Sequence, residues 1–384
     1  MISTRYNQNI PFLLLLAAAS SFVISLFLLQ LFAGILFFFW FFEKNSEKKK
    51  AIDLLSLSVL VFGIVRITAI ILSKYPFVSN ESLYKEALFY LSFFSFNFYL
   101  KVFSHEKKQL LIMVILGASV FASLTGIISF NFNLVERAQS FSSGGTAFSS
   151  YLLTVLPVLI FLSFEKTNKR FVFVWLIGII IILTGIITSL ERTNFAISLL
   201  VIGIGVSCRK INFTHLIILA TLVSLFSFIS FQNNSYVVSR IITNPLNPSD
   251  RNVIIKGAEM LMFDHPYIGF GPRTFRSIFP LMNQFTVKGV GGWHNDFLQI
   301  YFESGIIGLF SFLLLLSFIY YIGIKLLKKG NNDRDIIISL LLSVSCFVLL
   351  VTSGFITSSV ISMIFVLIIT LLNSYRVTSA ASSF

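Results

Sequence analysis

Two arginines near the middle of the chain have the type and setting expected of a clamp for an anionic substrate. Arg192 stands in Ser189-Leu190-Glu191-Arg192-Thr193-Asn194 between two apolar runs, and Arg251 follows Asp250 at the start of a segment with helical spacing. A guanidinium group suits phosphate because its planar fork can bind two oxygens at once. An arginine in the first turn of a helix opposes the helix dipole, which favours a dedicated role for Arg251. The alternatives are a snorkelling arginine at position 192 and a solvated charge at position 251.

A histidine further along the chain could act as a base. His294 lies in Gly291-Gly292-Trp293-His294-Asn295-Asp296, where a long polar segment enters an apolar run. An unperturbed imidazole titrates near about pH 6.5, so its neutral form is available to accept a proton from a hydroxyl. A lone interfacial histidine is usually structural, but this one follows two glycines at the start of a helix. The neighbouring Asn295 is a candidate for contact with the substrate.

Glu303 lies in the apolar run that begins after His294. A carboxylate inside a membrane helix is costly, which makes it a functional candidate by default. Glu303 would lie about 13 Å deeper than His294 along a continuous helix, and at about 100° per residue it would face away from His294. We therefore expect Glu303 to bond to another helix or to a backbone group, and we include it among the candidate substrate-binding residues.

Two glycines repeat one spacing. Gly203 follows Arg192 by eleven residues, and Gly305 follows His294 by the same interval. Eleven residues in a helix place each glycine on the face of its polar partner, about 16 Å deeper. Each glycine could open a groove for a lipid tail whose head group contacts the polar residue. Ordinary small-residue helix packing is the alternative.

Three more arginines complete the candidate substrate-binding set. Arg66 lies inside an apolar run, where it either snorkels outward or reaches an anion from within a helix bundle, while Arg273 and Arg276 lie in the long polar segment. The stretch Phe141-Ser142-Ser143-Gly144-Gly145-Thr146 precedes another apolar run and could form a backbone cradle for a polar ligand. These residues need a scaffold that brings them to one face.

The composition predicts that this scaffold is an all-α integral membrane protein. Apolar residues make up 56% of the 384 residues and charged residues only 12%, against about 25% charged in soluble domains. Runs long enough to span a bilayer recur along the chain. They fall at about residues 11–24, 25–42, 51–72, 83–103, 109–130, 147–164, 171–190, 194–208, 212–231, 295–324, 336–354 and 358–373. The first two come from one long run, which we divide near Ser20 and Ser21.

The distribution of basic residues predicts the orientation. The net charge of +13 would suggest nucleic acid in a soluble protein, but here most lysines and arginines fall in alternate connections, as cytoplasmic loops require. With about twelve spans, both termini are then cytoplasmic. The chain divides into helices 1–9 (residues 1–231), one long outer loop (232–293), and helices 10–12 with a cytoplasmic tail (294–384). The outer loop is basic, against the usual rule, which indicates an anionic substrate.

The outer loop contains one predicted helix. Asn252–Phe263 has helical spacing, Asp264-His265-Pro266 stops it, and Gly269 and Gly271 form a bend. We expect this amphipathic helix to lie along the membrane surface. The sequence carries no nucleotide-binding loop, and Cys208 and Cys346 have no partner at metal-ligand or disulfide spacing. We expect no cofactor and no metal, so the energy for any reaction would come from the substrate.

Three elements, taken in order, have a counterpart in a known family. The first is Ser189–Gly203, and the second is Asp250–Phe270, where an arginine opens a helix that ends in His265-Pro266-Tyr267-Ile268-Gly269-Phe270-Gly271. The third is His294-Asn295-Asp296-Phe297-Leu298-Gln299 with Glu303-Ser304-Gly305-Ile306-Ile307-Gly308. With the long outer loop, they resemble the O-antigen ligase/polymerase family, which includes Wzy-type polymerases, over about residues 140–325. Arg273 departs from that family's pattern, in which a small residue follows Gly-Pro.

The resemblance implies a metal-independent glycosyltransferase of the membrane-embedded GT-C type. Its donor would be an oligosaccharide on undecaprenyl diphosphate at the outer face of the bacterial cytoplasmic membrane. The acceptor would be a second lipid-linked repeat unit in a polymerase of O-antigen, capsule or exopolysaccharide, or lipid A-core in a ligase. His294 would activate the acceptor hydroxyl, and Arg192 and Arg251 would bind the diphosphate leaving group. Partners would be these lipids and the membrane, not nucleic acid.

Two other classes of function stay open at this point. A transporter of the same lipid-linked glycan would use similar substrates, but transporters often contain internal repeats and broken helices near the midplane. No repeat relates the two halves of this sequence, and the candidate polar residues gather at one face. A membrane subunit without enzymatic activity would tolerate substitution of His294 and Arg251. We favour a transferase, and narrowly a polymerase over a ligase.

Overall fold

The computed structural model describes residues 7–163, 169–232, 251–285, 290–328, 333–350 and 358–381, and within these residues all regular structure is helical. A helix covers each of the twelve predicted apolar runs. These helices are α1 (Asn9–Ile24), α2 (Leu26–Phe41), α4 (Leu54–Ile71), α5 (Pro76–Val102), α6 (His105–Asn131), α7 (Gly145–Ser163), α8 (Lys169–Thr188), α9 (Arg192–Ser207), α10 (Phe213–Gln232), α14 (Asp296–Lys328), α15 (Arg334–Leu349) and α16 (Ser359–Ala381).

Five of these helices, α4, α6, α7, α10 and α14, are long and apolar enough to cross a membrane. The bent pair of α2 and α3 (Asn45–Ala51) would make a sixth. Parts of α1, α8, α9 and α16 are apolar but shorter. The chain is therefore an all-helical membrane protein, while the number of twelve spans stays a prediction.

The first long apolar run divides into two helices, as predicted, but not at the predicted place. Ser20 and Ser21 lie inside α1, where both hydroxyls donate to the carbonyl of Ala17. The chain breaks at Ser25, whose backbone is extended and whose side chain accepts from the Leu28 amide at 3.4 Å. Serines inside a helix can bond back to the preceding turn, so they did not mark the break.

The helices pack into one bundle with a shared apolar core. Helix α5 packs against α16, α2 and α4, α7 packs against α15, α8 and α9, and α14 packs along α4. Many outward-facing side chains are also apolar; Phe27, Phe228 and Phe310 are 69%, 60% and 68% exposed. An apolar exterior of this extent suits contact with lipid chains.

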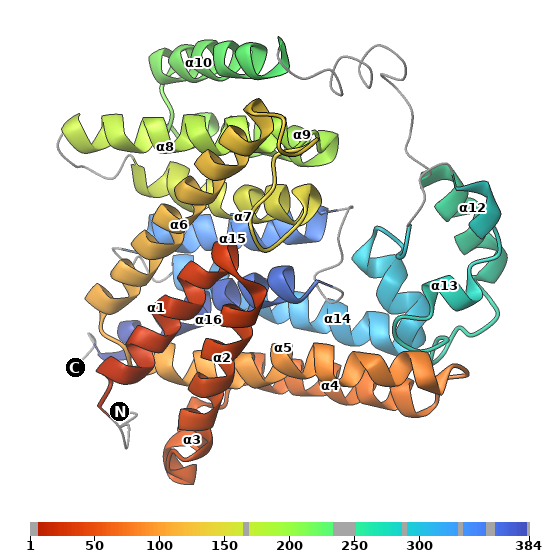
Figure 1. The fold of residues 1–384 in the computed structure, drawn as a ribbon. Helices are drawn as coiled ribbons and strands as arrows, with labels where there is room; N and C mark the ends of the chain where they lie inside the picture. Colours follow the sequence, from red (N-terminus) through yellow and green to blue (C-terminus); the bar gives the residue numbers. More distant parts are fainter. Residues whose placement is uncertain are drawn as a thin grey trace.

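The outer loop contains α12 (Arg251–Leu261), α13 (Phe275–Ile278) and the 3₁₀ turn Met282–Gln284. Figure 1 shows α12 and α13 at one end of the bundle, beside the turn between α4 and α5 and the start of α14. We call this the site end. The predicted loop helix at Asn252–Phe263 is confirmed as α12; its position on the membrane surface stays a prediction. Residues 233–250, the first part of the predicted loop, lie outside the described residues.

A polar network connects the end of α3, the start of α4, α5 and α16 at the opposite end of the bundle. Asp53 accepts hydrogen bonds from Lys101 Nζ at 2.6 Å and from Asn373 Nδ2 at 2.7 Å. Asn373 Nδ2 also donates to Asn97 Oδ1 at 2.8 Å, and Lys101 Nζ to the carbonyl of Ala51 at 2.6 Å. We call this the opposite-end network. It balances one cation with one carboxylate and joins only helices.

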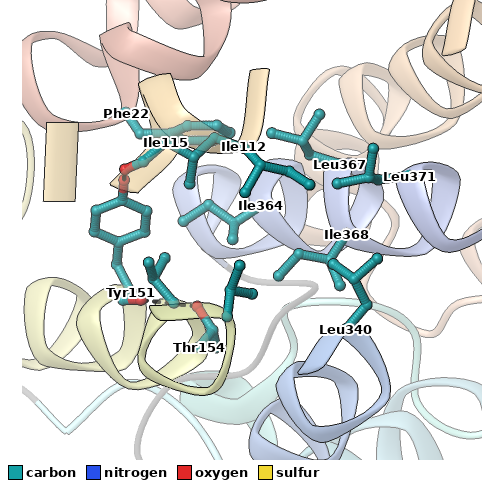
Figure 2. Close-up of a pocket in the computed structure, with 12 residues that line it drawn as sticks. Phe22, Ile112, Ile115, Tyr151, Thr154, Leu340, Ile364, Leu367, Ile368 and Leu371 are labelled. Carbon is teal, nitrogen blue, oxygen red and sulfur yellow. Dashed lines mark hydrogen bonds between the residues drawn. The ribbon is translucent and has the colours of Figure 1, made fainter. Parts of the chain in front are cut away.

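An apolar cavity lies inside the bundle between α1, α6, α7, α15 and α16 (Figure 2). Its lining includes Phe22, Ile112, Tyr151, Leu340 and Ile364. The hydroxyls at its wall are already engaged, since Tyr151 bonds with Ser119 at 2.7 Å and Thr154 donates to the carbonyl of Tyr151. None of the candidate site residues lines this cavity.

Candidate functional site

An aromatic cluster gives the outer loop its own core. Trp293 stacks on Phe302 of α14 with ring centroids 3.9 Å apart, and Phe275 and Phe279 meet the edges of this stack at 5.0 and 5.7 Å. The buried face of α12, including Ile254, packs against the same cluster. Because Trp293 precedes His294, this packing fixes the chain on one side of the predicted base.

Helix α14 is broken at Gly305, whose φ of 66° and ψ of −166° lie outside the helical region. In an intact helix the carbonyls of Phe302 and Glu303 would accept from the amides of Ile306 and Ile307. Both carbonyls and both amides instead bond to the loop after α12. The bonds are Phe270 N–H to Phe302 O at 2.7 Å, Gly271 N–H to Glu303 O at 3.1 Å, Ile306 N–H to Pro266 O at 2.7 Å and Ile307 N–H to Tyr267 O at 3.5 Å.

The glycines of the two family-like strings permit this contact. A Cβ on Gly305 would lie 2.1 Å from the backbone of Tyr267, and a Cβ on Gly269 would lie 2.5 Å from the Ser304 amide. Gly269 and Gly305 also have positive φ values of 77° and 66°, which disfavour other residues. The strings at 265–271 and 303–308 are therefore two sides of one junction. We call it the loop–helix junction.

The turn between α4 and α5 closes this junction from the other side. Ser73 Oγ donates to the carbonyl of Phe270 at 2.9 Å, and Ser79 Oγ donates to the carbonyl of Pro272 at 3.1 Å. A Cβ on Gly271 would collide with both serines. Three stretches that are distant in the sequence thus meet here, the third through the hydroxyls of Ser73, before α5, and Ser79, in its first turn.

Beneath the junction, Arg66 lies between two carboxylates. Its guanidinium, 1% exposed, makes a two-pronged pair with Glu86 and donates through Nη2 to Glu303 Oε2 at 2.8 Å and through Nη1 to Ser304 Oγ at 3.0 Å. Glu303 Oε1 accepts from the Arg273 amide at 2.9 Å and from Gln299 at 3.1 Å. We call Arg66, Glu86 and Glu303 the site-end cluster.

The site-end cluster and the break in α14 bear on three sequence-based expectations. Arg66 neither snorkels nor faces an incoming anion, because it is buried and its donors bind Glu86, Glu303 and Ser304. Glu303 bonds to another helix and to a backbone amide, as expected, so its side chain serves the junction. Gly305 does not open a groove beneath His294, because the helix breaks there and the backbone of Tyr267 fills the space.

Gly203, the other glycine of the repeated spacing, behaves differently. It lies within α9, is exposed, and has no atom within 4 Å of the position where a Cβ would stand. Open space therefore lies below Arg192 on this face of α9, as the groove hypothesis requires. Whether a lipid occupies that space stays a prediction.

One hydrogen bond brings Arg251 to the residue that follows Arg192. Arg192 is the first residue of α9 and is exposed, and Arg251 is the first residue of α12. Arg251 Nη2 donates to the hydroxyl of Thr193, the neighbour of Arg192, at 2.9 Å. This bond joins the outer loop to α9 across 58 positions of sequence.

The serine- and glycine-rich stretch lies against the same corner. Thr146 Oγ1 donates to Glu191 Oε1 at 2.7 Å, and Arg137 donates to the same oxygen at 3.1 Å. The Ala138 amide donates to the carbonyl of Thr188 at 3.1 Å. The segment before α7 thus lies next to Glu191, the neighbour of Arg192, and its role as a cradle for a polar ligand stays a prediction.

His294 lies at the entrance to α14, where it was expected. It has a positive φ of 50° and is partly exposed. Asn295 caps the helix, because its Oδ1 accepts from the amides of Phe297 and Leu298 at 2.9 and 3.1 Å. The side-chain oxygen of Asn295 therefore has a structural role, and only its amide nitrogen is left for a ligand.

The loop arginines occupy two different environments. Arg276 is exposed, and its Nε and Nη2 lie 3.3 Å from the position of a Cβ on Gly291, three residues before His294. Arg273 has a positive φ of 62°, and its amide is bound to Glu303. The left-handed backbone explains why a small residue is expected at position 273 in the family.

A second histidine of the loop, His265, packs against Phe270 at 4.6 Å between ring centroids. Partial burial and then the positive charge of Lys74 lower its pKa, while Asp264 opposes this shift. The lowered pKa favours the neutral form of His265 beside the junction. Among the residues described, no three His, Cys, Asp or Glu side chains come together as metal ligands would.

Sequence reasoning missed Glu86, the break in α14 and the aromatic core. Glu86 was visible as a carboxylate inside the predicted span 83–103, and the rule that singled out Glu303 applies to it equally. The break was hidden because a regular helix was assumed through Gly305. The core could not be recognised among 45 phenylalanines.

Comparison with known families agrees with the sequence motifs. Residues 172–313 match the family model described as O-antigen ligase. A search of curated proteins gave no match. The matched part begins in α8 and ends within α14, so it includes both clamp arginines, His294 and the loop–helix junction, but neither Arg66 nor Glu86. This match confirms the resemblance of the chain to the O-antigen ligase/polymerase family.

Proposed function

We propose that the protein transfers a glycan from undecaprenyl diphosphate to an acceptor sugar at the outer face of the cytoplasmic membrane, as a repeat-unit polymerase. The observation that carries the proposal is the hydrogen bond from Arg251 to Thr193, because it brings the cation that opens α12 to the first turn of α9, which Arg192 begins. Two arginines at one corner match a diphosphate, which accepts several charge-assisted hydrogen bonds.

In this proposal the arginines stabilise the leaving group. Cleavage of the bond between the donor sugar and the diphosphate leaves negative charge on the phosphate oxygens. Preorganised donors at the place where that charge develops lower the barrier. The diphosphate is already a good leaving group, so we expect no metal to be required.

His294 is the proposed base. Its imidazole would take the proton of the acceptor hydroxyl while the hydroxyl oxygen attacks the donor sugar. Two observations support this role. His294 is partly exposed at the start of α14, and it lies three residues after Gly291, which Arg276 contacts. Arg276 is proposed to hold charged or polar groups of the incoming substrate.

The test is transfer by purified protein in detergent. The substrate is undecaprenyl-diphosphate-linked oligosaccharide extracted from the strain that encodes the protein, with EDTA present. The variants are His294→Gln and Arg251→Ala, and the matched controls are His105→Gln and Arg209→Ala, which change the same residue types at the opposite end. We expect a ladder of longer lipid-linked glycans from wild type and both controls only.

The acceptor is decided in the same assay. Transfer that requires added lipid A-core would make the protein a ligase. Activity of His294→Gln equal to wild type would exclude the proposed base. A wild-type protein that makes no product with either acceptor, but moves the lipid-linked glycan across vesicles, would be a transporter.

A further inference from the structure

Arg66 and Glu86 lie outside the part of the chain that matches the O-antigen ligase family model, yet they contact its most distinctive string. Arg66 bonds to Glu303 and Ser304, which are consecutive residues just before the break in α14. Arg66 and Glu86 are 1% and 7% exposed. Neither side chain can therefore touch a substrate at the surface, and any effect on the reaction must pass through Glu303 and Ser304.

The buried charge of Glu303 makes its ion pair with Arg66 necessary for stability. Glu303 is buried, and a buried carboxylate without a partner is strongly destabilising. Arg66 is the one cation within 4.0 Å of Glu303 among the described residues. The guanidinium of Arg66 also orients its partners, because it is planar and its donors point in fixed directions. One edge binds Glu86, while Nη1 and Nη2 bind Ser304 and Glu303 of α14.

Glu303 in turn holds the outer loop by two kinds of contact. Its side chain accepts from the Arg273 amide, and its carbonyl accepts from the Gly271 amide. The loop therefore depends on the direction in which Glu303 points. Arg276 belongs to this loop and follows its position, whereas Arg251 is also held by Thr193 of α9.

The first segment of α14 transmits the same constraint to His294. This segment runs from Asp296 to Ser304 as a regular helix of about 13 Å. Near its inner end, Arg66 binds Ser304, and the neighbouring Phe302 stacks on Trp293, the residue before His294. A rotation at the inner end would displace the imidazole relative to the loop arginines.

We propose that Arg66 and Glu86 are positioning residues for the transfer site, acting through Glu303 to set His294 against the arginines of the outer loop. This inference rests on the proposed function. It also gives α4 and α5 a task that the family-like part of the chain does not perform for itself.

The experiment compares Arg66→Met with Lys101→Met. Lys101 is also a buried cation, 9% exposed, and lies in the opposite-end network, bound to Asp53. A third variant, Arg66→Met/Glu86→Gln/Glu303→Gln, removes all three charges of the site-end cluster together, so that no buried charge is left unpaired if Arg66→Met alone does not fold. Each is purified as a single folded species before measurement.

The first measurement is amide hydrogen exchange by mass spectrometry, which needs no substrate. The Phe270, Gly271 and Ile306 amides cross the junction, so peptides that contain them report its closure. We expect exchange in these peptides to be faster by about tenfold or more in both Arg66 variants and unchanged in Lys101→Met. Unchanged exchange in the triple variant would overturn the inference.

The second measurement is the kinetics of transfer per folded protein. Misplacement of a base by about 1 Å can lower a rate about 100-fold, so we expect kcat to fall on this scale in the triple variant. The KM for the lipid-linked donor should change by less than about threefold, because the Arg251 contact to α9 is separate. Lys101→Met should keep the wild-type kcat while it lowers Tm.

The outcomes separate the two proposals. A triple variant with wild-type kcat would show that the cluster only supports folding. A shared loss of kcat in Lys101→Met and the triple variant would also overturn the inference, because any lost buried cation would then suffice. If wild type transfers no glycan, the proposed function fails, and hydrogen exchange alone decides whether Arg66 and Glu86 hold the loop.

Discussion

At one end of α4 and α5, Lys101 meets a single carboxylate, Asp53, and neutral amides complete the bonding. At the other end, Arg66 meets two carboxylates, Glu86 and Glu303. The opposite-end network joins helix to helix and is balanced in charge. The site-end cluster joins helices to a loop and a broken helix, and it carries one more negative than positive group. A fold can therefore use buried charge either to fasten a scaffold or to connect that scaffold to a site.

The largest expected difference comes from the two glycines of the repeated spacing. Gly305→Ala adds a Cβ that collides with Tyr267 and forces a non-glycine residue to a positive φ. Strain and overpacking together should cost about 3–5 kcal/mol of unfolding free energy. Gly203→Ala has open space and a helical backbone, so it should lie within about 1 kcal/mol of wild type, on the stabilised side.

Denaturation in detergent, followed by circular dichroism, measures both glycine variants. Hydrogen exchange of residues 265–271 locates the damage, which should be confined to the junction for Gly305→Ala. Equal transitions for the two variants would mean that the break in α14 tolerates a side chain.

Neutralising one carboxylate at each end tests the difference in charge balance. Asp53→Asn leaves Lys101 buried without its anion and should cost about 3 kcal/mol. Glu86→Gln leaves Arg66 paired with Glu303, so a loss of about 1 kcal/mol is expected. Thermal unfolding monitored by intrinsic fluorescence gives the order, and a greater loss in Glu86→Gln than in Asp53→Asn would contradict it.

Substitution of one uncharged side chain at each end, Asn373 and Trp293, should lower the free energy of unfolding by smaller amounts. Asn373 Nδ2 donates to both Asp53 and Asn97, so Asn373→Leu should cost about 2 kcal/mol of unfolding free energy, because Asn97 Oδ1 loses its donor and Asp53 Oδ2 keeps only Lys101. The buried Nε1–H of Trp293 has no hydrogen-bond partner among the described residues. Trp293→Phe should therefore cost only about 1 kcal/mol, since packing and not a hydrogen bond is reduced. Chemical denaturation of the two variants checks this order.

The smallest effect is expected from pH. The pKa of His265 is lower in the folded protein, so the folded state resists protonation more than the unfolded chain does. The contribution of His265 to stability is then fully present above its pKa in the unfolded chain, about 6.5, and is lost as the pH falls toward its lower pKa in the folded protein. Tm should drop between about pH 7.5 and about pH 5.5, and His265→Gln should lessen that drop. An identical pH profile for both proteins would remove His265 from the junction's energetics.

The sequence predicted the helices well because hydropathy alone determines where membrane helices form. Every apolar run became a helix, and α12 formed where its apolar periodicity and the stop at Pro266 placed it. The prediction that Glu303 bonds to another helix or to a backbone group was also confirmed, because helical periodicity places it on a different face from His294. These predictions rely on local pattern, which a single sequence contains.

Contacts between distant segments were not predictable in the same way. Gly305 was predicted to be helical because it lies inside the long apolar run 295–324, and only the approach of Tyr267 explains the break. Arg66 was recognised as unusual, but its partners are 20 and 237 positions away. Arg251 and Thr193 were placed together only by the fold.

The break in α14 imposes an order on assembly in the membrane. Four backbone groups at residues 302, 303, 306 and 307 lack intrahelical partners, and such groups cost several kcal/mol each away from water. Residues 265–273 and the α4–α5 turn are synthesised before α14, so both are in place when that helix arrives. The loop–helix junction therefore closes only when α14 is made, and a ribosome stall or truncation before Gly308 would leave the loop without its backbone partners and exposed to proteases.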